Sequence, residues 1–93
     1  MAHIERERVT TDGTVKQLAK RNEVGLSGCF ITVEGNSVRV TWDGTDPVAA
    51  TLGHLIAAGD SFRLNSAAAI QNFKVTQESG AGAIEVTYDE RNR

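Results

Sequence analysis

The sequence contains few cysteine, proline and aromatic residues, and the scarcity of cysteine excludes two kinds of site. Among its 93 residues are one cysteine, one proline, one tryptophan, one tyrosine and three phenylalanines. A single thiol, Cys29, cannot close a disulfide within the chain and cannot build a metal site alone. Its position in a run of apolar and β-branched residues predicts a small buried side chain instead.

An excess of charge of one sign and long apolar runs are also missing. The net charge of −2 gives no general attraction toward nucleic acid or an anionic membrane. No apolar run approaches the roughly 18 residues that a membrane-spanning helix needs. The first residues lack the apolar core of a signal peptide, so we expect synthesis in the cytoplasm. We therefore expect neither nucleic acid nor a membrane as a partner.

Alternation of apolar and polar residues recurs along the chain and predicts short strands. Side chains that alternate with a period of two are typical of half-buried strands. The alternating or apolar segments are residues 29–33, 38–42, 61–64, 73–77 and 84–88. Residues 34–36 form a short turn, so we expect residues 27–42 to fold as a hairpin. Its first strand is apolar on both faces, which predicts an interior strand with cover on each side.

About six or seven short strands, separated by glycine-containing turns, predict an all-β fold. An alanine-rich run behind Asn65 and Ser66, each a candidate N-cap, fits only one or two helical turns. We expect a single small β-sandwich or jelly-roll-like domain over residues 14–93, with an extended charged N-terminal arm over residues 1–13. The expected core consists of Cys29, Ile31, Val33, Val38, Val40, Trp42, Leu55, Phe62, Leu64, Ile70, Phe73, Val75, Ile84, Val86 and Tyr88.

Residues 38–64 contain an apolar loop that we expect to fold back over one end of a sheet. Glycine, proline and aspartate at its corners indicate turns, because each favours turn geometry for its own physical reason. The predicted turn and loop residues are Asp43, Gly44, Pro47, Gly53, His54, Gly59 and Asp60.

The polar residues of this loop could carry chemistry, and each has a structural interpretation beside the functional one. His54 would need distant carboxylates to bind a metal, so we expect a hydrogen-bonded histidine that fastens the loop. Asp43, Asp46 and Asp60 lack the regular ligand spacing of a calcium loop and are interpreted as turn caps. Trp42 could stack on a sugar or a base, but its place in an alternating strand predicts a core residue. No phosphate loop, nucleophile elbow or catalytic triad can be assembled, so we expect no enzyme, no cofactor and no metal.

The N-terminal segment alternates acidic and basic residues between two apolar ends. It either lies along its own domain as an edge strand or projects to a neighbouring subunit. A small core and open sheet edges favour a homo-oligomer, and we expect a trimer. The expected interface residues are Ile4, Glu5, Arg6, Glu7, Arg8 and Val9.

The order of turn residues resembles that of small structural proteins of tailed bacteriophages and prophages. The resemblance spans residues 29–88, ends with a late strand at 84–88, and leaves the charged arm outside. It implies a virion protein that binds the major capsid protein or another virion protein. The motifs that carry it are Asp43-Gly44-Thr45-Asp46-Pro47, Gly53-His54-Leu55, Gly59-Asp60 and Leu64.

Three functions follow as hypotheses. The first, implied by the resemblance, is a capsid cement or decoration protein that binds and stabilises the head shell. The second is an accessory protein of the neck or tail of the virion. The third is a carbohydrate- or ligand-binding β-sandwich module that uses Trp42 and the loop at 43–60.

Overall fold

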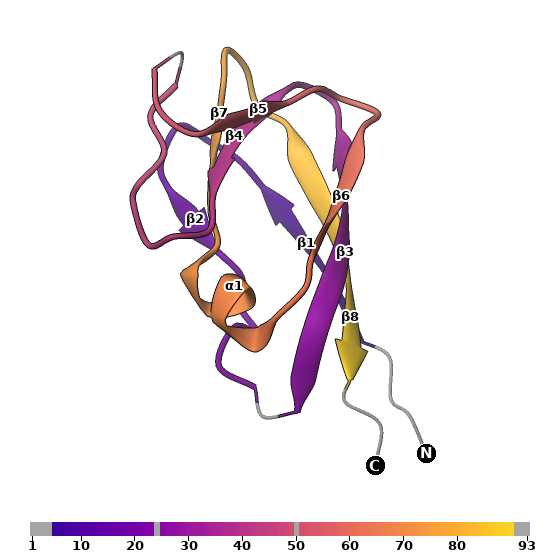
Figure 1. The fold of residues 1–93 in the computed structure, drawn as a ribbon. Helices are drawn as coiled ribbons and strands as arrows, with labels where there is room; N and C mark the ends of the chain where they lie inside the picture. The colour runs from indigo at the N-terminus through magenta and orange to yellow at the C-terminus, as the bar shows by residue number, and fades with distance from the viewer. Residues whose placement is uncertain (1–4, 24, 50, 91–93) are drawn as a thin grey trace.

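A computed structural model describes residues 5–23, 25–49 and 51–90 of the chain (Figure 1). Almost all of its regular structure is β, arranged as two antiparallel four-stranded sheets. The first sheet has the strand order β1-β8-β3-β6 and the second has the order β2-β7-β4-β5. The predicted all-β class is confirmed. Their bounds are β1 Glu5–Thr10, β2 Lys16–Gln17, β3 Leu26–Glu34, β4 Val38–Thr41, β5 His54–Ile56, β6 Ser61–Leu64, β7 Lys74–Gln77 and β8 Ala83–Glu90.

The charged segment at the N-terminus forms β1, the edge strand of the first sheet. It pairs with β8 over six residue pairs, from Glu5 opposite Tyr88 to Thr10 opposite Ala83. Of the two arrangements that the sequence left open, the structure has the edge strand. Ile4, the first of the expected interface residues, lies outside the described residues.

The expected hairpin at 27–42 is wrong, because its two strands belong to different sheets. β3 pairs with β8 on one side and with β6 on the other, so neither edge is free for β4. β4 instead lies between β5 and β7 in the second sheet. Val33 and Val38, on either side of the short connection, are 1% and 0% exposed, so both point into the interior shared by the sheets. A short turn therefore carries the chain from one sheet to the other.

Side chains from both sheets meet in one buried cluster. The alternation that predicted burial of Cys29, Ile31 and Val33 is confirmed. The members of the cluster are Leu18, Leu26, Cys29, Ile31, Val33, Val38, Val40, Leu64, Ile70, Phe73, Val75, Ile84, Val86 and Tyr88. Phe62 is partly buried and packs against it.

Two expected core residues are exposed. Trp42 is 39% exposed, because β4 ends at Thr41 and the indole lies at the margin of the interior. Leu55 is 53% exposed. It belongs to β5, a strand that the sequence did not predict, and it lies opposite Arg39. Since Val38 and Val40 define the inner face of β4, Leu55 and Arg39 face outward.

Two leucines that the sequence did not place in the core are buried because of irregular backbone. Leu18 follows the two-residue strand β2, too short for alternation to be visible. Leu26 precedes a register shift between Leu26 and Gly28, which reverses the alternation at the start of β3. A Cβ at Gly28 would lie 2.6 Å from the carbonyl oxygen of Leu64, so only glycine allows this approach.

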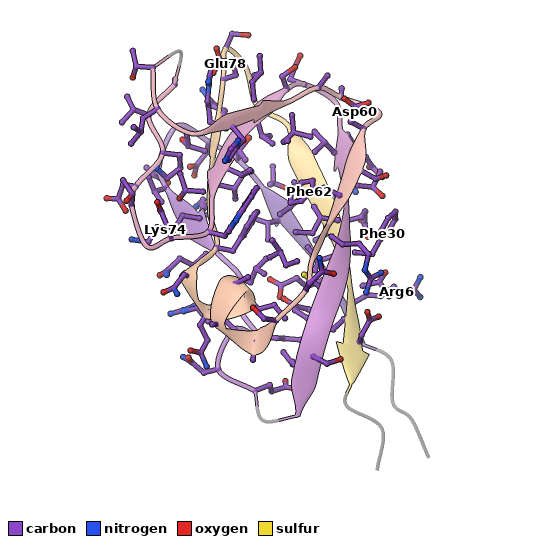
Figure 2. The ribbon with its side chains drawn as sticks, in the orientation of Figure 1. Arg6, Phe30, Asp60, Phe62, Lys74 and Glu78 are labelled. Carbon is purple, nitrogen blue, oxygen red and sulfur yellow. The ribbon has the colours of Figure 1, made fainter. Side chains whose placement is uncertain are left out.

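β3 is an interior strand, but the expectation of cover on both faces is wrong. Phe30 points to the outer side of the first sheet and is 41% exposed. Figure 2 shows this ring on the outside of the sheet, near Arg6. The phenyl ring of Phe30 is therefore a surface feature of the protein.

A single short helix, α1 (Ala67–Asn72), joins β6 to β7. Of the two candidate N-caps, Asn65 and Ser66, the structure has Ser66: its Oγ accepts a hydrogen bond from the amide of Ala69 at 3.1 Å. Ile70 turns into the core and is fully buried. Across the described ranges, no helix has the length and apolar character required to span a membrane.

Candidate functional site

The turn that follows β4 is held by side chains at both of its ends. The Asp43 carboxylate accepts a hydrogen bond from the amide of Thr45 at 3.0 Å, and the hydroxyl of Thr41 donates to the carbonyl of Thr45. Gly44 has φ of +89°, a left-handed conformation that favours glycine. Lys74, on the neighbouring strand β7, donates to the carbonyl of Gly44 at 3.1 Å. The predicted turn role of Asp43 and Gly44 is confirmed.

The carboxylate of Asp46 has a different role from the turn cap that we expected. It accepts a hydrogen bond from Lys74 Nζ at 2.7 Å, as one half of an ion pair that fastens the loop to β7. In Asp43, the hydrogen bonds from Thr45 lower the pKa of the carboxyl below its ordinary value, with a smaller contribution from the charge of His54. Both aspartates are therefore engaged within the chain.

The loop continues from the buried Pro47 into a tight hairpin-like turn. Val48 and Leu52 form an antiparallel bridge in which each amide donates to the other's carbonyl, at 3.0 and 2.9 Å. Gly53 then returns the chain to β4 with φ of +110°. A Cβ there would lie 2.9 Å from the carbonyl oxygen of Val40 and 3.3 Å from the Cβ of Pro47. The loop thus packs against the end of the second sheet, as the sequence predicted.

His54 and Trp42 form a stacked pair beside this loop. Their ring centroids are 4.7 Å apart and the ring planes differ by 11°. Trp42 also lies 6.3 Å from the ring of Phe62, which approaches Phe73 at 6.1 Å. A row of four rings therefore runs from the surface into the core. His54 is the first residue of β5, so the structure places it in a strand and not in the expected loop, and stacking on Trp42 holds its ring.

A pocket of about 330 Å³ opens beside the stacked pair. Trp42, Asp43 and Leu52 are among the residues that line it. Its volume is at the lower end of the range for small-molecule sites. The neighbouring imidazole covers part of the indole face that would otherwise be open for stacking on a sugar ring. The pocket combines an aromatic wall with one carboxylate that is already used in a turn.

The predicted turn at Gly59 and Asp60 connects the second sheet back to the first. Gly59 has φ of +94°, and its amide donates to the carbonyl of Val33 at 2.8 Å. The amide of Asp60 donates a hydrogen bond to the carbonyl of Ala57. The carbonyl of Asp60 accepts a hydrogen bond from the amide of Val33. These backbone bonds align β6 with β3.

Glu7 in β1 is an anchor that the sequence did not reveal. Its carboxylate accepts hydrogen bonds from the amides of Ala19 and Lys20, at 2.9 and 3.3 Å, and from the hydroxyl of Tyr88. Burial, followed by the bond to Glu7, raises the pKa of Tyr88. Burial likewise raises the pKa of the neighbouring Cys29 thiol to about 11, so we expect little of the reactive thiolate at neutral pH. Glu7 and the apolar Val9 are two residues apart, so in a strand they lie on the same face. That spacing is the signal that could have predicted an inward-facing Glu7.

The outer face of the first sheet is polar except at Phe30. Arg8 pairs with Glu34 at 2.9 Å and with Glu85 at 2.6 Å, and Arg63 pairs with Asp89. Phe30 lies opposite Arg63 on β6 and opposite Thr87 on β8, so it occupies the middle of this face. The result is an aromatic side chain surrounded by ion pairs.

Metal ligands are not gathered in the part of the chain that the structure describes: no group of three or more histidine, cysteine, aspartate or glutamate residues could hold an ion there. Comparisons of the chain with protein-family models, curated proteins and solved structures give no match.

Proposed function

We propose that the protein is a non-enzymatic structural protein of a phage virion that binds and stabilises the head shell as a capsid cement or decoration protein. The proposal joins the resemblance of the turn motifs to the exposed features of the fold. Its partner is the major capsid protein or another virion protein.

The observation that supports it best is the position of Phe30. An aromatic side chain at the centre of a sheet face, with charged residues around it, has the anatomy of a protein–protein contact. The phenyl ring supplies apolar area that a partner can bury. The surrounding ion pairs, Arg8 with Glu34 and Glu85 and Arg63 with Asp89, form a polar rim.

A second support comes from how the polar side chains of the chain are used. Glu7 holds the segment at 19–20, Asp43 caps a turn, and Arg39 pairs with Glu78 at 2.8 Å. Arg39 also donates to the carbonyl of Gly53 at 3.0 Å. Residues committed to the fold in this way suit a protein that presents a fixed surface to a repeating shell.

We also propose that the two sheets form a β-sandwich. One buried cluster receives side chains from both sheets, which is the arrangement of a β-sandwich. We further propose a homotrimer, because a chain of this size has a small core and gains from a symmetric contact. Light scattering on the full-length protein measures that state directly.

Binding to bare shells assembled from a phage major capsid protein, the proposed partner, tests the function. Wild-type protein should co-sediment with bare shells at a fixed ratio and raise the temperature at which they disassemble. Phe30→Ser should weaken binding at least tenfold, because loss of a buried anchor at an interface costs about 2 kcal/mol or more. Val48→Ser is the matched control, since Val48 is 50% exposed on the loop of the other sheet.

One outcome would overturn the cement role, and another would overturn the assignment of its contact face. Protein that fails to bind shells and is found only in the neck or tail of purified particles is a neck or tail accessory protein. Equal binding by wild type and Phe30→Ser removes the outer face of the first sheet from the contact.

A second candidate function, carbohydrate or ligand binding, is favoured by the pocket of about 330 Å³ beside Trp42. A glycan array tests it, with Trp42→Ala as the control variant. Specific glycan binding that this substitution abolishes would support the module; no binding above background would eliminate it.

A further inference from the structure

The free edge of β1 presents backbone groups that are available to another strand. Thr11 donates its amide to the carbonyl of Gly82 at 2.9 Å, which extends the pairing of β1 with β8. In an antiparallel pair, residues alternate between those bonded to the partner and those whose amide and carbonyl point away. By this alternation, Arg6, Arg8 and Thr10 direct their backbone groups to the open side.

Edge strands are usually protected against pairing with other chains, and in β1 charged side chains provide this protection. Proline, a bulge or a covering segment commonly blocks such an edge. β1 has no proline, and its six-pair register with β8 is regular. Along β1, the segment at 19–20 bonds to the inward-facing side chain of Glu7. The backbone edge at 6–10 therefore carries no other strand in the described part of the chain.

The side chains of β1 are separated by sign between its two faces. Arg6, Arg8 and Thr10 are exposed on the outer face, whereas Glu7 and Val9 are half-buried on the inner face. Arg8 already has two carboxylate partners on its own sheet. Arg6 has no ion-pair partner among the described residues, and its side chain extends into solvent (Figure 2).

This separation disfavours a second copy of the chain as the occupant of the edge. Residues directly opposite each other in a continuous sheet face the same side, so the arginines of one β1 would meet the arginines or Thr10 of the other. Like charges directly opposite are destabilising. The other described edge strands offer no alternative, because β2, β5 and β6 contain no acidic residue.

We propose that the open edge of β1 is a docking site for an extended acidic segment of another protein, which adds to the first sheet as a fifth strand. Backbone hydrogen bonds to Arg6, Arg8 and Thr10 supply the affinity, as in other strand additions. A carboxylate on the outer face of the segment, opposite Arg6, supplies the selectivity. This inference goes beyond the shell-binding role, since it concerns the edge of the sheet and a peptide partner rather than the face around Phe30.

Three end-capped octapeptides and the full-length protein test the proposal. The first repeats Glu-Thr-Glu-Val, the second has lysine in place of each glutamate, and the third keeps the glutamates but carries a methyl group on the backbone nitrogen of each, which removes the amide donors that face β1. Fluorescence anisotropy gives the affinities, and NMR hydrogen exchange of the labelled protein gives the location. The acidic peptide should bind at least tenfold more tightly than the other two. It should slow exchange at the amides of Arg6, Arg8 and Thr10.

Charge variants separate the edge of β1 from general attraction. Arg6→Glu should weaken binding of the acidic peptide roughly tenfold and strengthen binding of the lysine peptide. Arg6→Gln should weaken binding of the acidic peptide a few-fold. Arg63→Glu is the matched control, because Arg63 lies on the same outer face at the opposite edge, in β6. Its affinity should equal that of the wild type.

Any of four results would overturn the proposal. The acidic peptide does not bind; the lysine or N-methylated peptide binds equally well; protection appears at β6 instead of β1; or Arg63→Glu weakens binding as much as Arg6→Glu. Because shells are absent from these measurements, their outcome is separate from that of the shell-binding test.

Discussion

Replacement of Glu7 by alanine should destabilise the protein strongly, although Glu7 belongs to an edge strand. The substitution removes the acceptor of three hydrogen bonds: from the amides of Ala19 and Lys20, and from the fully buried Tyr88. Hydrogen bonds to charged groups contribute about 1.5–3 kcal/mol, and a buried hydroxyl left without a partner costs about 1–3 kcal/mol. Water can replace the carboxylate at the exposed amide of Ala19, so we expect a total loss of about 2–4 kcal/mol.

Urea denaturation followed by circular dichroism measures this loss, and thermal unfolding should show a midpoint lower by roughly 10–25 °C. Arg6→Ala is the control on the same strand and should change stability by less than about 0.5 kcal/mol. A double-mutant cycle with Tyr88→Phe should give a coupling of about 0.5–3 kcal/mol between the two side chains. If Glu7→Ala costs less than about 0.5 kcal/mol and shows no coupling to Tyr88, the assignment of Glu7 as the anchor of β1 is refuted.

Three further predictions concern single residues. The hydrogen bonds that lower the pKa of Asp43 stabilise the fold above its ordinary value of 3.8, and this contribution is lost as the pH falls through the lowered value. Asp43→Ala should therefore reduce the dependence of the urea midpoint on pH below about 4, and an unchanged dependence would contradict this. Gly53→Ala should cost about 2–4 kcal/mol, because it adds a close contact to an unfavourable φ. Gly59→Ala, with open space around a similar φ, should cost about 1–2 kcal/mol in the same assay; equal losses would argue against the contact with Val40. Cys29 should react slowly with a thiol reagent at neutral pH and quickly in denaturant, and equal rates would disprove its burial.

Local patterns predicted the elements well where one face of a strand or helix is buried. Alternation placed Cys29, Ile31 and Val33 in the core, because a period of two is a property of the strand backbone itself. The helix N-cap could be narrowed to Asn65 or Ser66, since a cap uses an amide only a few residues away; the structure has Ser66. Asp43 caps its turn within two residues for the same reason of short range.

The same patterns could not assign partners. Residues 34–36 suit a hairpin turn, yet β3 and β4 lie in different sheets because β8 and β6 already occupy both sides of β3. Trp42 continues the alternation of β4, but whether the interior extends so far depends on where the sheets end. Leu55 was expected in the core because the segment around it is apolar. The strand β5 turns Leu55 outward, opposite Arg39, and β5 forms only by pairing with β4, so no local pattern reveals it.

By itself, the sequence determined the all-β class, the turn positions between strands and most of the buried side chains, because these follow from chain stereochemistry and local periodicity. Only the tertiary structure decided that Glu7 is an internal anchor while Arg6 faces solvent, and that Phe30 lies exposed in the middle of a charged face. Those outcomes depend on contacts between residues far apart in the chain, such as Glu7 with Tyr88 and Arg8 with Glu85. Local propensity carries no information about which distant strand becomes a neighbour.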